Sequence, residues 1–135
     1  MSDRAKTPMR RMARAPHLSP EVLDRREDGN SLEQDWRVPA ELDCWPGHFP
    51  EQSILPGVLQ IDWLMRTIEA WTGRSPRLAR IEALKFKQLV GPEERLTLRL
   101  ERDTGGAVFR FRLANGDATI SSGRVVLDAT PEGEA

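Results

Sequence analysis

Two titratable side chains, His48 and Asp62, stand fourteen positions apart in the middle of the chain. A histidine beside a carboxyl group can act as a general acid–base pair. Between them, Pro56 and Gly57 open a segment with a helical pattern, and the first N–H groups of a helix have no partner inside the helix. These donors and the positive end of the helix dipole suit an oxygen that gains negative charge during a reaction. The stretch therefore predicts proton transfer with stabilisation of an oxyanion.

The elements that would position these residues are a turn-rich loop and an apolar helix. Gly47, Pro50 and Pro56 shape the backbone of the loop, because proline fixes its own φ and extends the residue before it. From Val58 to Trp71 apolar side chains cover most of the helix surface, so we expect protein to surround this helix on most sides. Gly73 is a typical residue for its end.

The sequence from Gly47 to Trp63, GHFPEQSILPGVLQIDW, resembles the active-site signature of the hot-dog-fold 3-hydroxyacyl-thioester dehydratases of the FabZ and FabA type. That signature has a G-H-F-P loop, a hydrophobic pair ending in P-G, and a helix with Glu or Asp at the position of Asp62. The segment LPGVLQIDW is most similar to the small dehydratases of aryl-polyene biosynthetic clusters, the ApeI-like group. Leu84-Lys85-Phe86-Lys87 is similar to the K-F-R strand of the family.

The resemblance implies a reaction and a role for each matching residue. His48 would remove the Cα proton of a 3-hydroxyacyl thioester, the Gly57 N–H would donate to the enolate-like oxygen, and Asp62 would handle the departing 3-hydroxyl group. The product would be a trans-2-enoyl thioester, formed without a metal or a redox cofactor. The residues expected to contribute to substrate binding beside Gly57 are Phe49, Pro56 and Arg66.

Asp62 and Arg66 also have a purely structural interpretation, because an Asp and an Arg four positions apart on a helix form an ordinary salt bridge. Such a pair would weaken Asp62 as a proton donor. Glu69 lies three residues beyond Arg66 and could take the guanidinium instead. We therefore expect Arg66 to pair with Glu69, with solvent or with a partner subunit, and to leave Asp62 facing His48.

The rest of the chain alternates apolar and polar residues with the period of half-buried strands. Strands are expected over 22–26, 31–38, 78–89, 96–101, 109–113 and 118–127. Asp28-Gly29-Asn30 and Asn115-Gly116 predict hairpin turns, and Gly123 predicts a bulge or a bend in the last strand. Two strands, one helix and four strands predict an α+β fold with a curved antiparallel sheet wrapped around one long central helix. The resemblance independently implies this hot-dog arrangement.

The composition fits one folded domain, with 135 residues of which 39% are hydrophobic and 30% charged. A net charge of −1 argues against a dedicated nucleic-acid binder, and no stretch is apolar enough to span a membrane. We expect a disordered basic arm over 1–20, the dehydratase domain over 21–129 and a polar tail over 130–135. Because the chain has a single cysteine, Cys44, an internal disulfide is excluded, which fits a cytoplasmic location. A cysteine at such a position more often packs in a loop or the core than acts as a nucleophile.

The resemblance also implies partners. The substrate would be a 3-hydroxyacyl group on the phosphopantetheine of an acidic acyl carrier protein, which a basic surface attracts. The residues expected to dock this carrier are Arg74, Arg77, Arg80, Lys85 and Lys87, with a solvated surface as the alternative. The nearly all-apolar helix predicts a dimer with sheets joined edge to edge, either a homodimer or a heterodimer with a related dehydratase. By the resemblance, His48 would face Asp62 of the neighbour.

Three other functions remain open. A dehydratase-like subunit without activity of its own could support an active paralogue, and Glu51, where FabZ has Gly, and Arg66 favour this alternative. A hot-dog acyl thioesterase would need a carboxylate at another helix position and would release a free acid. A regulatory acyl-binding module is the weakest alternative, because no DNA-binding segment accompanies the domain.

Overall fold

The computed structural model describes residues 19–40 and 54–128. In chain order their elements are β1 (Glu21–Asp28), β2 (Ser31–Arg37), α2 (Gly57–Thr72), β3 (Leu78–Phe86), β4 (Arg95–Arg102), β5 (Val108–Asn115) and β6 (Ala118–Leu127). The predicted order of two strands, one helix and four strands is confirmed. The predicted domain boundaries at residues 20 and 130 stay predictions, because 1–18 and 129–135 lie outside the described residues.

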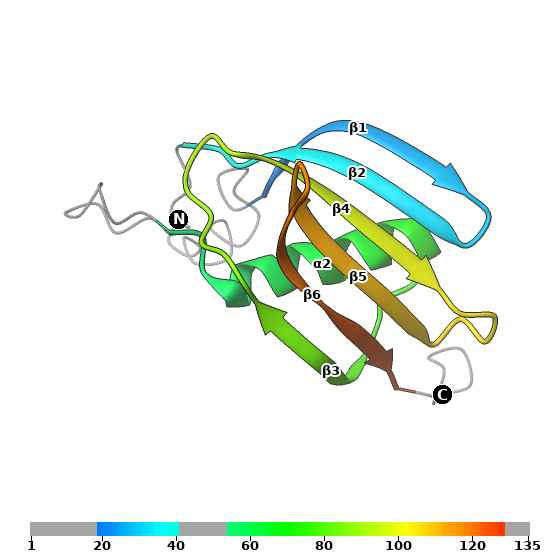
Figure 1. Cartoon of the computed structure of the whole chain (residues 1–135). Coiled ribbons are helices and arrows are strands. Elements are labelled where there is room, and N and C mark those ends of the chain that lie inside the picture. Colours follow the sequence, from blue (N-terminus) through cyan, green and yellow to red (C-terminus); the bar gives the residue numbers. More distant parts are fainter. Residues whose placement is uncertain (1–18, 41–53, 129–135) are drawn as a thin grey trace, which may run out of the picture.

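The strands form one antiparallel sheet in the order β1-β2-β4-β5-β6-β3, so β1 and β3 are its edges. Figure 1 shows the sheet curving over α2, which crosses its concave face. This is the α+β hot-dog arrangement that the sequence predicts, with one helix inside a curved sheet.

Alternating side chains of the sheet pack on the helix. In β2, Leu32 and Trp36 are buried between partly exposed neighbours, and β4 and β5 repeat this alternation. The helix contributes Trp63, Leu64 and Ile68 to the same core. The Trp36 and Trp63 rings meet edge to face with their centroids 5.6 Å apart, a favoured geometry for aromatic pairs. The core thus determines which face of α2 points to the sheet.

The ends of α2 lie where the sequence predicts them. Pro56 precedes the first turn with φ −63° and ψ 146°, and its carbonyl oxygen accepts hydrogen bonds from the N–H groups of Leu59 and Gln60, both at 3.1 Å. Gly73 ends the helix at φ 74°, and its N–H donates to the Glu69 carbonyl oxygen at 2.8 Å. A residue with a side chain is strained at this φ, which explains the glycine.

The edge strand β3 differs in detail from the prediction. Its register against β6 shifts just after Glu82, opposite Gly123, and Ala83 within the shift has φ 54°. A bulge is therefore present opposite Gly123, but its extra residue lies in β3, and Gly123 itself keeps its register with Phe111 of β5. β3 also ends at Phe86, before the predicted end at Leu89, which is 73% exposed.

Candidate active site

The described part of the predicted site is the start and the exposed face of α2. His48 and Phe49 belong to the segment 41–53, which lies outside the described residues, and so do Cys44 and Glu51. The roles predicted for these residues therefore stay predictions. The site residues that can be placed are Pro56, Gly57, Asp62 and Arg66.

The first turn of α2 presents two backbone N–H groups, those of Gly57 and Val58, that have no acceptor among the described residues. No side chain of the described residues caps this end of the helix, and Pro56 before it carries no N–H. Val58 is 79% exposed. Free N–H groups at a helix start favour an anionic oxygen, so the geometry allows the oxyanion binding predicted for Gly57.

Gly57 lets the side chain of Phe86 reach the start of the helix. A Cβ built on Gly57 would lie 2.8 Å from Cζ and 3.0 Å from Cε1 of the Phe86 ring, closer than side chains normally approach. Phe86 is the last residue of β3 and is 48% exposed. The sequence identifies Phe86 only as part of a strand motif and does not predict that its ring contacts the start of α2.

A buried polar pair joins the same part of α2 to β6. Ser121 Oγ donates a hydrogen bond to Gln60 Oε1 at 3.0 Å, and Ser121 and Gln60 are 1% and 6% exposed. Ser121 is also the register partner of Phe86 between β6 and β3. The sequence analysis missed this pair, although a glutamine among the apolar residues at the start of the helix was a usable signal.

Asp62 and Arg66 lie on the exposed face of α2 and form an ion pair. Arg66 Nη2 lies 2.5 Å from Asp62 Oδ2, and the Arg66 and Asp62 side chains remain 42% and 47% exposed. Arg66 Nη1 donates to Ser19 Oγ at 2.9 Å, whereas Glu69 accepts a hydrogen bond from Ser75 at 3.2 Å. The expectation that Arg66 leaves Asp62 free is therefore wrong. An acid four residues before a base is the pairing that a helix favours.

The exposed face of α2 is wider than its apolar pattern predicts. Exposed residues recur about one turn apart at Val58, Asp62, Arg66, Glu69 and Ala70. The expectation that protein surrounds the helix on most sides stays a prediction, because it includes a second subunit, and within the described part of one chain the sheet covers only one face of α2. The edge strand β3 is also exposed at most of its positions.

The basic residues predicted to dock a carrier protein are all exposed. They lie in the loop after α2, in β3 and just beyond it: Arg74, Arg77, Arg80, Lys85 and Lys87. Arg80 donates to the Glu82 carboxylate at 2.6 Å, and Arg124 donates to the same group at 2.7 Å. These two guanidinium groups hold the pKa of Glu82 below its ordinary value. The charge of Arg80 is thus partly neutralised by its own strand.

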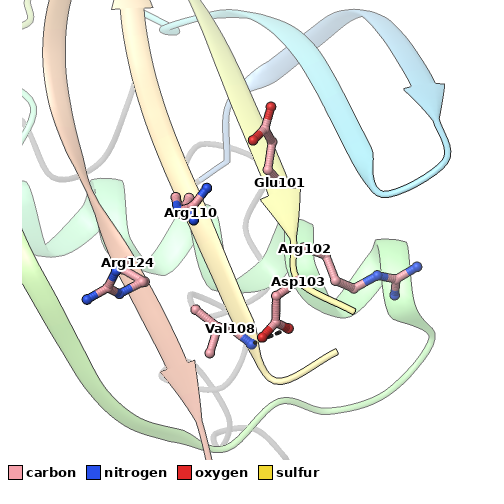
Figure 2. A pocket seen from close by; sticks show the side chains of 6 residues that line it. All are labelled: Glu101, Arg102, Asp103, Val108, Arg110 and Arg124. Carbon is pink, nitrogen blue, oxygen red and sulfur yellow. Dashed lines mark hydrogen bonds between the residues drawn. The ribbon is translucent and has the colours of Figure 1, made fainter. Parts of the chain in front are cut away.

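The pocket in Figure 2 lies elsewhere, near the turn between β4 and β5. Its lining residues are Glu101, Arg102, Asp103, Val108, Arg110 and Arg124. Asp103 accepts hydrogen bonds from the N–H groups of Gly106 and Val108, at 2.9 and 3.3 Å, so this carboxylate holds the turn. None of the predicted site residues lines this pocket.

Among residues 19–40 and 54–128, no helix combines the length and the hydropathy of a membrane span. Within the same residues, no three His, Cys, Asp or Glu side chains are grouped so that they could hold a metal ion.

Comparisons with known proteins find similarity in sequence and in structure. Residues 24–124 match the family described as ApeI-like, ApeI dehydratase. The 3-hydroxyacyl-[acyl-carrier-protein] dehydratase FabZ of Clostridium beijerinckii is 32% identical over 99 residues, which cover 64% of this chain and 70% of that protein. FabZ of Gluconacetobacter diazotrophicus is 31% identical over 118 residues, with 77% and 73% covered.

Among solved structures, the chain is similar to the dehydratase heterocomplex ApeI:P from Xenorhabdus doucetiae. The TM-score is 0.73 at 29% sequence identity, and the match covers 81% of this chain and 97% of the other.

Proposed function

Because the chain belongs to the family of ApeI-like dehydratases, we propose that it removes water from 3-hydroxyacyl thioesters and forms trans-2-enoyl thioesters. The observation that carries this proposal is the start of α2, where the N–H groups of Gly57 and Val58 lack an acceptor among the described residues. The elimination creates an enolate-like oxygen that needs such donors. Biosynthesis of fatty-acid or polyene type is the pathway class that uses this reaction.

In the proposed mechanism, His48 takes a proton from Cα of the thioester, and the electron pair moves into the carbonyl group. The Gly57 N–H stabilises the oxygen that becomes negative. When the carbonyl re-forms, the electron pair makes the Cα–Cβ double bond and the C–O bond at C3 breaks. Asp62, or a water that it holds, protonates the departing hydroxyl, so one water leaves. Phe49, Pro56 and Arg66 would contribute to the substrate site.

We further propose that the site is completed by a second subunit. The Asp62 side chain is 47% exposed on the free face of α2, whereas an acid that serves a buried reaction needs a protein neighbour. A dimer that covers this face and joins two β3 edges would bring His48 of one subunit to Asp62 of the other. The similar ApeI:P structure is described as a dehydratase heterocomplex, so the second subunit is either a copy of this chain or a related dehydratase.

The proposed substrate carrier is an acyl carrier protein, which is also named in the FabZ relatives. An acidic carrier would dock on the exposed basic residues after α2 and along β3, the group Arg74, Arg77, Arg80, Lys85 and Lys87. Long-range attraction by such a surface raises the association rate and weakens with salt. Replacing Lys85 and Lys87 by Glu should therefore raise KM for the carrier-bound substrate and leave kcat unchanged.

The test is mass spectrometry of 3-hydroxyacyl carrier protein after incubation with the purified chain, alone and with a related dehydratase subunit. Loss of one water supports the proposal, and His48→Ala should slow that loss about 10²–10⁴-fold. If His48→Ala keeps more than about a tenth of the rate, the base assigned here is wrong. Release of a free acid instead of an enoyl thioester would identify a thioesterase.

A second candidate function is a supporting subunit without catalysis of its own. The ion pair between Asp62 and Arg66 favours it, because the guanidinium occupies the carboxylate that the mechanism needs. In a heterodimer with an active paralogue, Asp62→Asn in this chain would then leave the rate unchanged. Under the proposed function the same substitution abolishes dehydration at the active sites that use Asp62 of this chain.

A further inference from the structure

We propose that Phe86 is a positioning residue for the backbone donor at the start of α2, and that it acts together with the buried Gln60–Ser121 hydrogen bond. This inference rests on the proposed function, in which the Gly57 N–H stabilises the enolate-like oxygen. It assigns a role in the reaction to three side chains, those of Phe86, Gln60 and Ser121, for which the resemblance implies no role.

The first contact is between Phe86 and Gly57. The ring presents its far edge to the backbone of Gly57, since a Cβ there would lie 2.8 Å from Cζ, 3.0 Å from Cε1 and 3.3 Å from Cε2. The backbone of the first turn therefore lies directly against the ring. Because Gly57 has no side chain, the ring sets how closely the helix start approaches the end of β3.

Two sets of hydrogen bonds hold the strand end on the sheet. The N–H groups of Lys87 and Gln88 donate to the carbonyl oxygen of Ile120, at 2.7 and 3.4 Å. Two residues further on, Val90 accepts a hydrogen bond at 2.7 Å from the N–H of Leu55, just before the helix. The segment after Phe86 is thus tied both to β6 and to the chain that enters α2.

The Gln60–Ser121 pair ties the same turn to β6. Ser121 stands opposite Phe86 in the β3–β6 register, and its hydroxyl reaches Gln60 at 3.0 Å from within the core. A buried polar pair has little freedom, because breaking it leaves an unsatisfied group. Phe86 and the Gln60–Ser121 pair therefore hold the first turn of α2 against the β3–β6 end of the sheet.

The position of the Gly57 N–H group matters for the proposed reaction. A hydrogen-bond donor stabilises a transition state only when it lies at the oxygen position of that state, and a misplacement of about 1 Å can cost about 10²-fold in rate. A residue that only stabilised the fold would change the melting temperature without this loss of kcat in the folded enzyme.

The experiment compares the wild type with Gly57→Ala, Phe86→Leu and the double variant, in the assembly that shows dehydration. Ala at position 57 should push the ring and the first turn apart, and should lower kcat at least about tenfold with KM changed by less than about threefold. Leu at position 86 removes the ring edge, so the double variant should regain at least about fivefold of the kcat lost by Gly57→Ala. Leu89→Ala, which truncates a 73% exposed apolar residue, is the matched control and should leave kcat unchanged.

Circular dichroism and melting temperature show whether each variant is folded. Full activity of Gly57→Ala, or a double variant whose loss is the product of the two single losses, would overturn the positioning role. If Gly57→Ala fails to fold, Ser121→Ala decides, because loss of the hydrogen bond to Gln60 should then lower kcat in a folded enzyme. A wild type that never releases water refutes the proposed function itself, whereas an active wild type without rescue refutes the positioning inference alone.

Discussion

The Arg66 guanidinium lies 2.5 Å from the Asp62 carboxylate, four residues away on the exposed face of α2. Asp62 is the proposed acid, so the pair must open or be bypassed when substrate binds. An exposed ion pair of this kind is weak, about 0.3–0.5 kcal/mol, and a substrate hydroxyl or a partner subunit can replace it. We therefore regard the pair as compatible with catalysis.

Substitutions at these two residues test that interpretation. Asp62→Asn should lower the dehydration rate at least about 10²-fold, because the amide cannot donate the proton of an acid. Asp62→Glu should keep part of the rate, since related dehydratases carry Glu, and Arg66→Gln should be tolerated. The rates are measured on variants whose folding is checked by circular dichroism. An active Asp62→Asn beside a folded but inactive Arg66→Gln would make Arg66 the functional residue.

A second prediction concerns the pH dependence of stability. Arg26 in β1 donates to both Glu33 and Asp35 in β2, at 3.1 Å in each case. The pKa of Glu33 is lowered by Arg99 and Arg26, and that of Asp35 is lowered by Arg26 and by the Thr97 hydroxyl. A carboxyl group whose pKa is lower in the folded state stabilises the fold above its unfolded pKa and loses this contribution as the pH falls through the folded pKa.

The melting temperature should therefore fall as the pH drops below about 4, the ordinary range of carboxyl groups. The double variant Glu33→Gln/Asp35→Asn should melt lower near neutral pH and show a smaller acid-induced decrease. Asp117→Asn, in the exposed β5–β6 turn, is the control and should follow the wild-type curve. Equal slopes for the wild type and the double variant would mean that these two carboxylates do not contribute to acid sensitivity.

Much of this architecture could be predicted because local chemistry determines it. Gly73 has φ 74° and Gly116 has φ 61°, a backbone conformation that favours glycine, so both residues mark the ends of their elements in the sequence. The alternation in β4 and β5 matches their burial because each strand has one face on the helix. The hot-dog arrangement follows when these patterns are combined.

Other features depend on which parts of the chain meet in space. The contact between Gly57 and Phe86 joins α2 and β3, which are far apart in the sequence. A periodic pattern of apolar residues does not predict such a contact. The exposure of Asp62 could not be predicted either, since an apolar helix surface looks the same whether its own sheet or a second subunit covers it. The pairing of Arg66 depended on a competition between Asp62 and Glu69 that spacing alone leaves undecided.

A third prediction concerns Gly123 in β6. A Cβ there would lie 3.0 Å from Cε2 of Phe111 and 3.3 Å from the backbone oxygen of Glu82. Because neither the buried ring nor the strand backbone can move freely, Gly123→Ala should destabilise the fold by about 1–3 kcal/mol. Gly105→Ala is the control, since its nearest neighbours are Asp103 oxygens at 3.9 Å. Urea unfolding measures both, and equal midpoints for the two variants would contradict the predicted crowding.

The last prediction concerns assembly. Val58, on the exposed face of α2, is 79% exposed, and an exposed apolar residue beside the proposed site is explained if a second subunit covers it. We expect a dimer at micromolar concentration by light scattering, and Val58→Lys should shift it toward the monomer because a charge would enter the interface. Val22→Lys is the matched control, since Val22 is 51% exposed on the opposite edge strand β1. A monodisperse monomeric wild type, without and with a related dehydratase subunit, would contradict the shared site, and so would a dimer that Val22→Lys disrupts and Val58→Lys does not.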